Sequence, residues 1–241
     1  MTLKSPFPGA LFESLASRVL LFLISMDLIF VIIHLVHGAD GFRAGLFFSI
    51  ESDGGYAERF QYLKYVTIVI LLGCIAIKEK RLSYIGWILL FLYFLLDDSL
   101  QVHERGGHWI GELSGFSTHL NLRPGEVGQA LVSLAVGMIL MPILYITYRN
   151  GTVAFKKFSQ DIALLVAVLI FFGIFVDMVH SAVALTRFVT LAASMTVMED
   201  GGEMLVLSLI VWYVLLFQRR DWDAQAYLID WLRVRLQHRD A

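Results

Sequence analysis

Long apolar stretches alternate with short polar segments along the first 218 residues of the chain. An α-helix needs about 20 predominantly apolar residues to cross a bilayer. By that criterion the pattern predicts six transmembrane helices, over residues 17–37, 60–77, 82–103, 126–148, 160–184 and 199–218. The expected fold is therefore an all-α integral membrane protein, a bundle of about six helices in which residues 1–218 form one transmembrane domain.

Composition supports this interpretation and excludes several classes of protein. Of the 241 residues, 58% are hydrophobic and only 17% are charged, which is too apolar for a soluble domain of this length. The net charge is −2 and no segment is strongly basic, so we expect no nucleic-acid partner. Cys74 is the single cysteine, which excludes an intramolecular disulfide and argues against a thiolate metal site.

The distribution of Lys and Arg predicts the orientation. With the N-terminus in the cytoplasm, thirteen of these residues fall on the inner side and six on the outer side. The six assigned to the outer side are Arg43, Arg59, Lys64, Arg105, Arg123 and Arg187. We therefore expect both termini in the cytoplasm of a multi-pass protein of the bacterial inner membrane. Residues 219–241, where Trp and Leu alternate with charge, are expected to form an amphipathic helix on the inner membrane surface.

Polar residues inside the predicted helices gather towards the outer side. The third helix ends in a polar stripe, in which Asp97, Gln101 and Glu104 share one face, Asp98 lies beside it and His103 lies roughly opposite. The other helices add further acids and imidazoles: Asp27 near the middle of the first helix, and, towards the outer side, His34, His37, Glu126, Asp177, His180, Glu199 and Glu203. An ionised side chain in hydrocarbon is costly, so such a set calls for partners or for a function.

Carboxylates and imidazoles from several helices are the ligands that iron, zinc or manganese use in proteins. The spacing Asp177-x-x-His180 resembles the Glu-x-x-His pairs of ferritin-like di-iron bundles. We therefore expect one or two divalent metal ions, iron or zinc. The candidate ligands are His34, His37, Glu104, Asp177, His180 and Glu203; Asp97 and Asp27 are the catalytic candidates, and Asp98, Gln101, Glu126 and Glu199 are expected to support the site.

Structural explanations stay open for several of these residues. Glu199 follows Thr196 by three residues, as in a capping box at the start of the sixth helix. Glu126 follows Pro124, where an acid is favoured by the helix dipole. Asp177 and His180 could also form a simple buried hydrogen bond. The stripe predicts no role for His103, which is expected to be interfacial.

Three functions fit the pattern. The first is a metal-dependent membrane oxidoreductase or hydrolase that acts on a lipid or another apolar substrate. The second is a proton- or cation-coupled transporter or channel that uses Asp27 as a relay, although the inner halves of the helices offer few polar residues. The third is a haem-binding cytochrome with histidine axial ligands. Membrane lipids are the expected partners, and the oligomeric state is left open.

Overall fold

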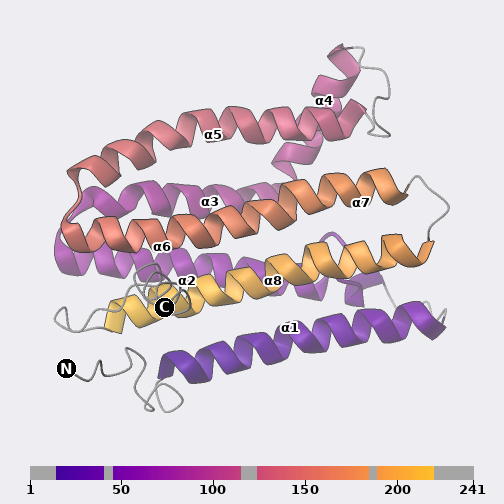
Figure 1. Cartoon of the computed structure of the whole chain (residues 1–241), viewed down its shortest axis with the longest axis horizontal. Coiled ribbons are helices and arrows are strands. Elements are labelled where there is room, and N and C mark those ends of the chain that lie inside the picture. Colours follow the sequence, from indigo (N-terminus) through magenta and orange to yellow (C-terminus); the bar gives the residue numbers. More distant parts are fainter. Residues whose placement is uncertain (1–14, 41–45, 115–123, 185–188, 220–241) are drawn as a thin grey trace, which may run out of the picture.

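The computed structural model describes residues 15–40, 46–114, 124–184 and 189–219. Their regular secondary structure is helical throughout, which confirms the predicted all-α class (Figure 1). In chain order the elements are α1 (Leu15–Asp40), η2 (Leu46–Phe48), α2 (Tyr56–Glu79), η3 (Leu82–Tyr84), α3 (Ile85–Leu100), α4 (Val102–Ser114), α5 (Pro124–Asn150), α6 (Val153–Ile170), η4 (Phe171–Val176), α7 (Asp177–Ala184) and α8 (Val189–Arg219).

Six helical segments are long and apolar enough to cross a membrane, as the hydropathy pattern predicts. They are Leu15–Val36, Tyr56–Glu79, Leu82–Leu100, Val127–Asn150, Val153–His180 and Ser194–Arg219. The fifth begins seven residues earlier than expected, because the Thr152 hydroxyl caps α6 by accepting a hydrogen bond from the Phe155 N–H. The predicted surface helix at 219–241 lies, from residue 220 onward, outside the described residues.

Helix α8 is the central element of the bundle and packs against α1, α2, α6 and α7. Its side chains are the most extensively buried of the six spans. At one end, η3 and α6 pack with α8 through a cluster of rings, in which Tyr84 and Phe155 meet edge to face at 4.9 Å and Phe158 and Phe217 lie 4.3 Å apart. Each such pair contributes about 0.5–1.5 kcal/mol beyond its burial, so this end of the bundle is well fixed.

A buried ion pair joins α1, α2 and α8. Lys64 Nζ donates to Asp27 Oδ1 at 2.5 Å and to the Met204 carbonyl at 3.0 Å, and the Ser208 hydroxyl donates to Asp27 Oδ2 at 2.6 Å. Both charged side chains are only 1% exposed. Lys64 is therefore a residue of the bundle interior and not a charge of the outer loops, which leaves thirteen inner against five outer Lys and Arg residues in the orientation count.

The third predicted helix, 82–103, is interrupted. Gln101 has a left-handed backbone (φ 53°), so α3 ends at Leu100 and the chain turns before α4 begins at Val102. The segment between the predicted helices 82–103 and 126–148 is helical as far as Ser114. Helix α4 then packs closely against the start of α5, because both helices carry glycine where they meet. A Cβ on Gly107 would lie 2.5 Å from the Gln129 backbone nitrogen, and one on Gly128 would overlap the Gly107 carbonyl.

Candidate functional site

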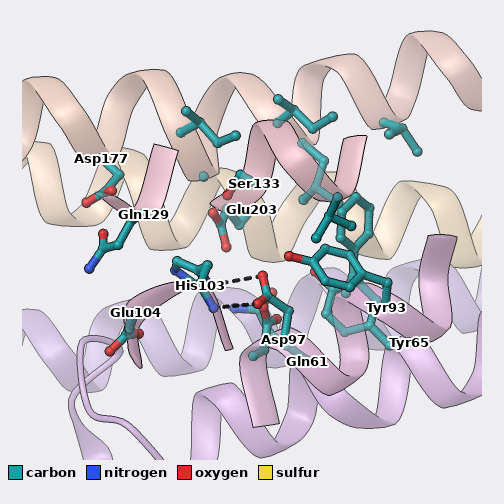
Figure 2. Close-up of a pocket in the computed structure, with 18 of the residues that line it drawn as sticks. Gln61, Tyr65, Tyr93, Asp97, His103, Glu104, Gln129, Ser133, Asp177 and Glu203 are labelled. Atoms are coloured by element: carbon teal, nitrogen blue, oxygen red, sulfur yellow. Dashed lines mark hydrogen bonds and ion pairs between the residues drawn. The ribbon is translucent and has the colours of Figure 1, made fainter. Parts of the chain in front are cut away.

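A cavity of about 890 Å³ extends between the helices and is acidic at one end and apolar at the other. The apolar end runs between α3, α5 and α6, where Leu90, Leu140 and Val166 are among the residues that line it. Figure 2 shows part of the polar end, where labelled side chains of α2, α3, α4, α5, α7 and α8 face one another. The ten carboxylate residues at this end are Glu51, Asp53, Glu58, Asp97, Asp98, Glu104, Asp177, Glu199, Asp200 and Glu203.

Among the described residues, histidines are the only side chains of the cavity wall that could carry a positive charge. His103, His108 and His180 line it, and no Lys or Arg of the described chain does so. Unpaired negative charge is costly where water is scarce. The acidic end therefore favours a positively charged ligand.

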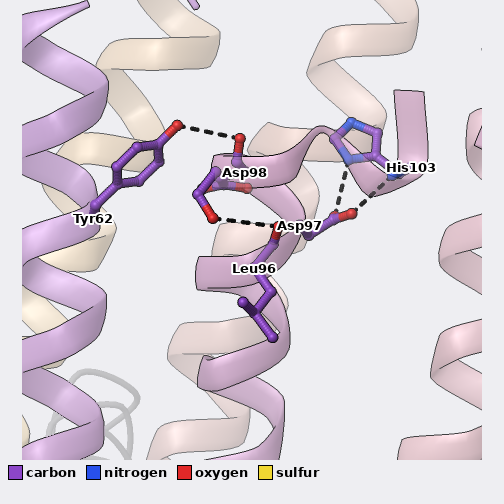
Figure 3. Close-up of polar contacts among 6 residues, drawn as sticks. Tyr62, Leu96, Asp97, Asp98 and His103 are labelled. Carbon is purple, nitrogen blue, oxygen red and sulfur yellow. Dashed lines mark hydrogen bonds and ion pairs between the residues drawn. The ribbon is translucent and has the colours of Figure 1, made fainter. Parts of the chain in front are cut away.

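Asp97 and His103 form one carboxylate–imidazole pair on the α3–α4 wall (Figures 2 and 3). Asp97 Oδ1 accepts the His103 backbone N–H at 2.9 Å, and Asp97 Oδ2 lies 2.9 Å from His103 Nδ1. The left-handed turn at Gln101 creates this arrangement, because it lets the Asp97 carboxylate cap the first turn of α4. The prediction that His103 points away from the site assumed one continuous helix and was wrong.

Burial and neighbouring acids together shift the pKa values of two groups in this wall. Burial lowers the pKa of His103, but the hydrogen bond and negative charge of Asp97 outweigh that effect, and the net shift is upward from 6.5. Burial is also the main reason that the pKa of Glu104 is raised, with Asp53 adding to the effect. Asp97 therefore makes His103 easier to protonate than a free imidazole.

Asp98 is held beside this pair by α2. The Tyr62 hydroxyl donates to the Asp98 carbonyl at 3.2 Å (Figure 3) and also donates to the Glu58 carboxylate. The carboxylates of Asp97 and Asp98 both line the cavity. Asp98 therefore lies in the same cavity wall as Asp97.

A second carboxylate–imidazole pair lies on the α7–α8 wall. His180 Nδ1 lies 2.6 Å from Glu199 Oε2, and the other ring nitrogen, Nε2, lies 3.2 Å from the Thr196 hydroxyl. Asp177, one turn before His180, lies within electrostatic reach of Glu199. Because α8 begins at Val189, Glu199 is well inside the helix. The capping-box explanation for Glu199 is therefore wrong.

Glu203 completes this wall by packing over an irregular part of the facing helix. Residues Phe171–Val176 form a π-helical segment between α6 and α7, a feature that is often found at functional sites. A Cβ on Gly173 would overlap the Glu203 carboxylate, so glycine is needed for this close approach. A Cβ on Gly202 would likewise lie 2.5 Å from the Phe172 ring. The glycines bring Glu203 into the cavity.

Comparison with known families assigns most of this structure to one domain. A family match covers residues 59–218, which is most of the chain and includes both carboxylate–imidazole pairs. The chain belongs to DUF8692, a domain of unknown function. No curated protein and no solved structure matches the chain significantly. The DUF8692 match begins near the start of α2, so α1 lies outside it.

Several predicted site residues do not line the DUF8692 cavity. Asp27 is held in its ion pair with Lys64, and His34 Nδ1 contacts the Ser49 hydroxyl at 3.1 Å; neither lines the cavity. Gln101 does not line it either, because its amide donates to Asp53 at 2.8 Å. The side chains of His37 and Glu126 lie outside the described part of the structure.

The remaining predicted residues do line the cavity, but they do not form a ready coordination site. Asp97, Asp98, Glu104, Asp177, His180, Glu199 and Glu203 all contribute to the wall. Within the described ranges, however, no group of three or more His, Cys, Asp or Glu side chains is arranged so that it could hold a metal ion. A metal ion would therefore require some of these side chains to turn.

Several polar residues of the DUF8692 cavity were not predicted, among them Glu51, Asp53 and Glu58 and two residues with buried atoms that have no hydrogen-bond partner. Gln61 on α2 is 9% exposed, and its Oε1 atom has no hydrogen-bond partner. The hydroxyl oxygen of Tyr93 on α3 is also buried and has no partner. Both line the cavity between its acidic and apolar ends. A buried acceptor without a partner is costly, so Gln61 favours a ligand that can donate a hydrogen bond.

Proposed function

We propose that this protein is a metal-dependent membrane enzyme that acts on an amphipathic substrate in the DUF8692 cavity. The observation that carries the proposal is the pair of carboxylate–imidazole contacts, Asp97 with His103 and Glu199 with His180, on two walls of one acidic cavity. Histidines that bind metals usually donate their other ring N–H to a carboxylate, which fixes the tautomer and the ring orientation. Both contacts use Nδ1, which leaves Nε2 as the atom that can bind the metal.

The residues proposed to hold the ion are His180 through Nε2, Asp177 and Glu203, with Glu199 orienting the imidazole. At His180 the ion would take the place of the Thr196 hydroxyl. The contact of that hydroxyl with Nε2, at 3.2 Å, is longer than the 2.6 Å contact of Nδ1 with Glu199. The bound ion would supply a Lewis acid that activates water or dioxygen. The carboxylate-rich donor set favours iron over zinc.

The rest of the cavity would provide for the substrate and for proton transfer. His103, held by Asp97, is placed to exchange a proton with a group bound in the acidic end. The apolar end would take the hydrocarbon part of the substrate. The distribution of Lys and Arg supports an orientation with both termini inside and the acidic end towards the outer face of the membrane.

Metal analysis of the purified protein tests this proposal. We expect one or two equivalents of iron or zinc per chain, and a clear loss of metal in His180→Ala and in Glu203→Ala. His34→Ala is the matched histidine control, because His34 contacts Ser49 outside the cavity and should leave metal content unchanged. Glu112→Gln is the carboxylate control, since Glu112 is exposed on α4.

Each variant should elute as a folded, monodisperse protein before its metal is measured. Unchanged metal content in both His180→Ala and Glu203→Ala would contradict the proposed ligands. A wild-type protein that binds no divalent metal, even after reconstitution with iron or zinc, would contradict the enzyme proposal and would favour the transport alternative.

A further inference from the structure

The cavity combines features that together specify the substrate class. Its acidic end has ten carboxylate residues and no lining Lys or Arg among the described residues. A phosphate, sulfate or carboxylate headgroup would find no positive side chain there apart from histidine. A positively charged headgroup would offset the negative charge of the wall.

The buried acceptor without a partner further limits which kinds of cationic headgroup fit the cavity. Gln61 Oε1 is buried, has no partner, and belongs to the cavity wall between the acidic and apolar ends. An ammonium group carries N–H donors that could satisfy this oxygen, whereas a quaternary ammonium group could not. The ring of Phe94, 6.1 Å from that of Tyr65, lies in the same stretch of wall and would tolerate a cation.

The apolar end has the dimensions of a single hydrocarbon chain. From Asp97 at the acidic end to Trp87, which also lines the cavity, α3 advances ten residues, or about 15 Å. This is close to the length of an extended dodecyl chain. The total volume of about 890 Å³ lies within the range of cavities that bind one small ligand, about 300–1,000 Å³.

We infer that the cavity binds a single-chain amphipath with a primary ammonium headgroup. The ammonium group lies among Gln61 and the acids of the α2 and α3 walls, and the chain lies between α3, α5 and α6 with its end near Trp87. The inference deepens the proposed function by naming the substrate class, and it rests on that function for the reaction but not for binding.

Binding can be measured through Trp87 in lipid nanodiscs. Dodecylamine brominated near its methyl end should quench tryptophan fluorescence, and Trp87→Phe should remove most of the quenching. Dodecyl sulfate and dodecanol with the same bromination are the matched ligands. We expect saturable quenching by the amine, with an affinity about tenfold or more above that of the alcohol and of the sulfate. Unlabelled dodecylamine should compete.

Two variants test the two ends of the cavity separately. Gly137→Phe on α5 should abolish Trp87 quenching, because a Cβ there meets no atom within 4 Å and the ring would enter the apolar end. Gly73→Phe on α2 is the matched control, since a Cβ at Gly73 also meets nothing within 4 Å and Gly73 does not line the cavity. Gln61→Leu should weaken binding of the amine about tenfold and leave binding of the matching dodecyltrimethylammonium ion, which has no N–H donor, unchanged.

The outcomes separate this inference from the metal proposal. The inference is overturned if amine, sulfate and alcohol quench equally. It is also overturned if unlabelled amine does not compete with the quenching of wild-type protein. Both results would indicate partition into the bilayer. Retention of quenching in a folded Gly137→Phe variant would overturn the placement of the chain. Amine binding by a protein that holds no metal would support the inference while contradicting the metal proposal, and metal without amine binding would do the reverse.

Discussion

The buried pair of Asp27 and Lys64 gives the sharpest test of how this bundle is held together. Both side chains are 1% exposed, and each has a further hydrogen bond, from the Ser208 hydroxyl and to the Met204 carbonyl. Replacing one member leaves the other charge buried without its counter-ion. Such changes cost about 3–5 kcal/mol in proteins. We therefore expect Asp27→Asn and Lys64→Met each to lower the free energy of unfolding by about that amount.

The double variant distinguishes a paired charge from two independent contributions. Asp27→Asn combined with Lys64→Met removes both charges, so no ion is left unpaired in the interior. Replacing a whole buried pair is often close to neutral. We expect the double variant to be about 2 kcal/mol more stable than the less stable single variant. Ser208→Ala should cost about 1.5–3 kcal/mol, because it removes one hydrogen bond to the charged carboxylate.

Unfolding in mixed micelles, followed by circular dichroism, provides the measurement. Lys80→Gln is the control, because Lys80 is exposed at the end of α2. The proposed pairing is refuted if each single variant costs less than about 1 kcal/mol, or if the double variant loses the sum of the two. Either result would mean that the two charges do not stabilise each other, and Asp27 would again be available for another role.

Two further predictions concern the α4 region. Gly107→Ala should destabilise the protein by about 1–3 kcal/mol, because its Cβ would meet the Gln129 backbone; Gly137→Ala, which meets nothing, is the control in the same unfolding assay. The pKa of His103 is higher in the folded protein than in the unfolded chain, where it is about 6.5. The pairing of His103 with Asp97 therefore stabilises the fold fully below pH 6.5. This contribution is lost as the pH rises through the folded pKa. The difference in stability between wild type and His103→Gln should shrink with rising pH over that window, and a constant difference would contradict the raised pKa.

Hydropathy was sufficient to locate the six spans, because the cost of exposing polar backbone and charge to hydrocarbon leaves little choice. It did not reveal the turn at Gln101. A left-handed residue is usually marked by Gly or Asn, and Gln carries no such signal. Once the helix is taken as continuous, His103 falls on the wrong face. One backbone angle therefore decided whether the Asp97–His103 pair could be foreseen.

The sequence also did not reveal which residues far apart in the chain are in contact. Lys64 sits 37 residues after Asp27, and nothing in the local pattern of α2 separates a buried lysine from one at the interface. The π-helical segment at 171–176 also has no sequence signature, although it brings Gly173 against Glu203. Periodicity predicts which face a residue occupies, but it assumes a regular helix. Site residues that depend on irregular backbone need the structure.

The two groups of buried charge in this bundle lead to opposite conclusions about function. Asp27, a catalytic candidate from its position in mid-span, has its charge balanced by Lys64 within the bundle. The acids around Glu203 share their cavity with histidines and with no lining Lys or Arg of the described residues. Burial of a carboxylate is therefore a poor guide to function, because a fold can neutralise it internally. The informative feature is a set of carboxyl groups with no Lys or Arg beside them, and among the described residues such a set lines one cavity that also has an apolar chamber.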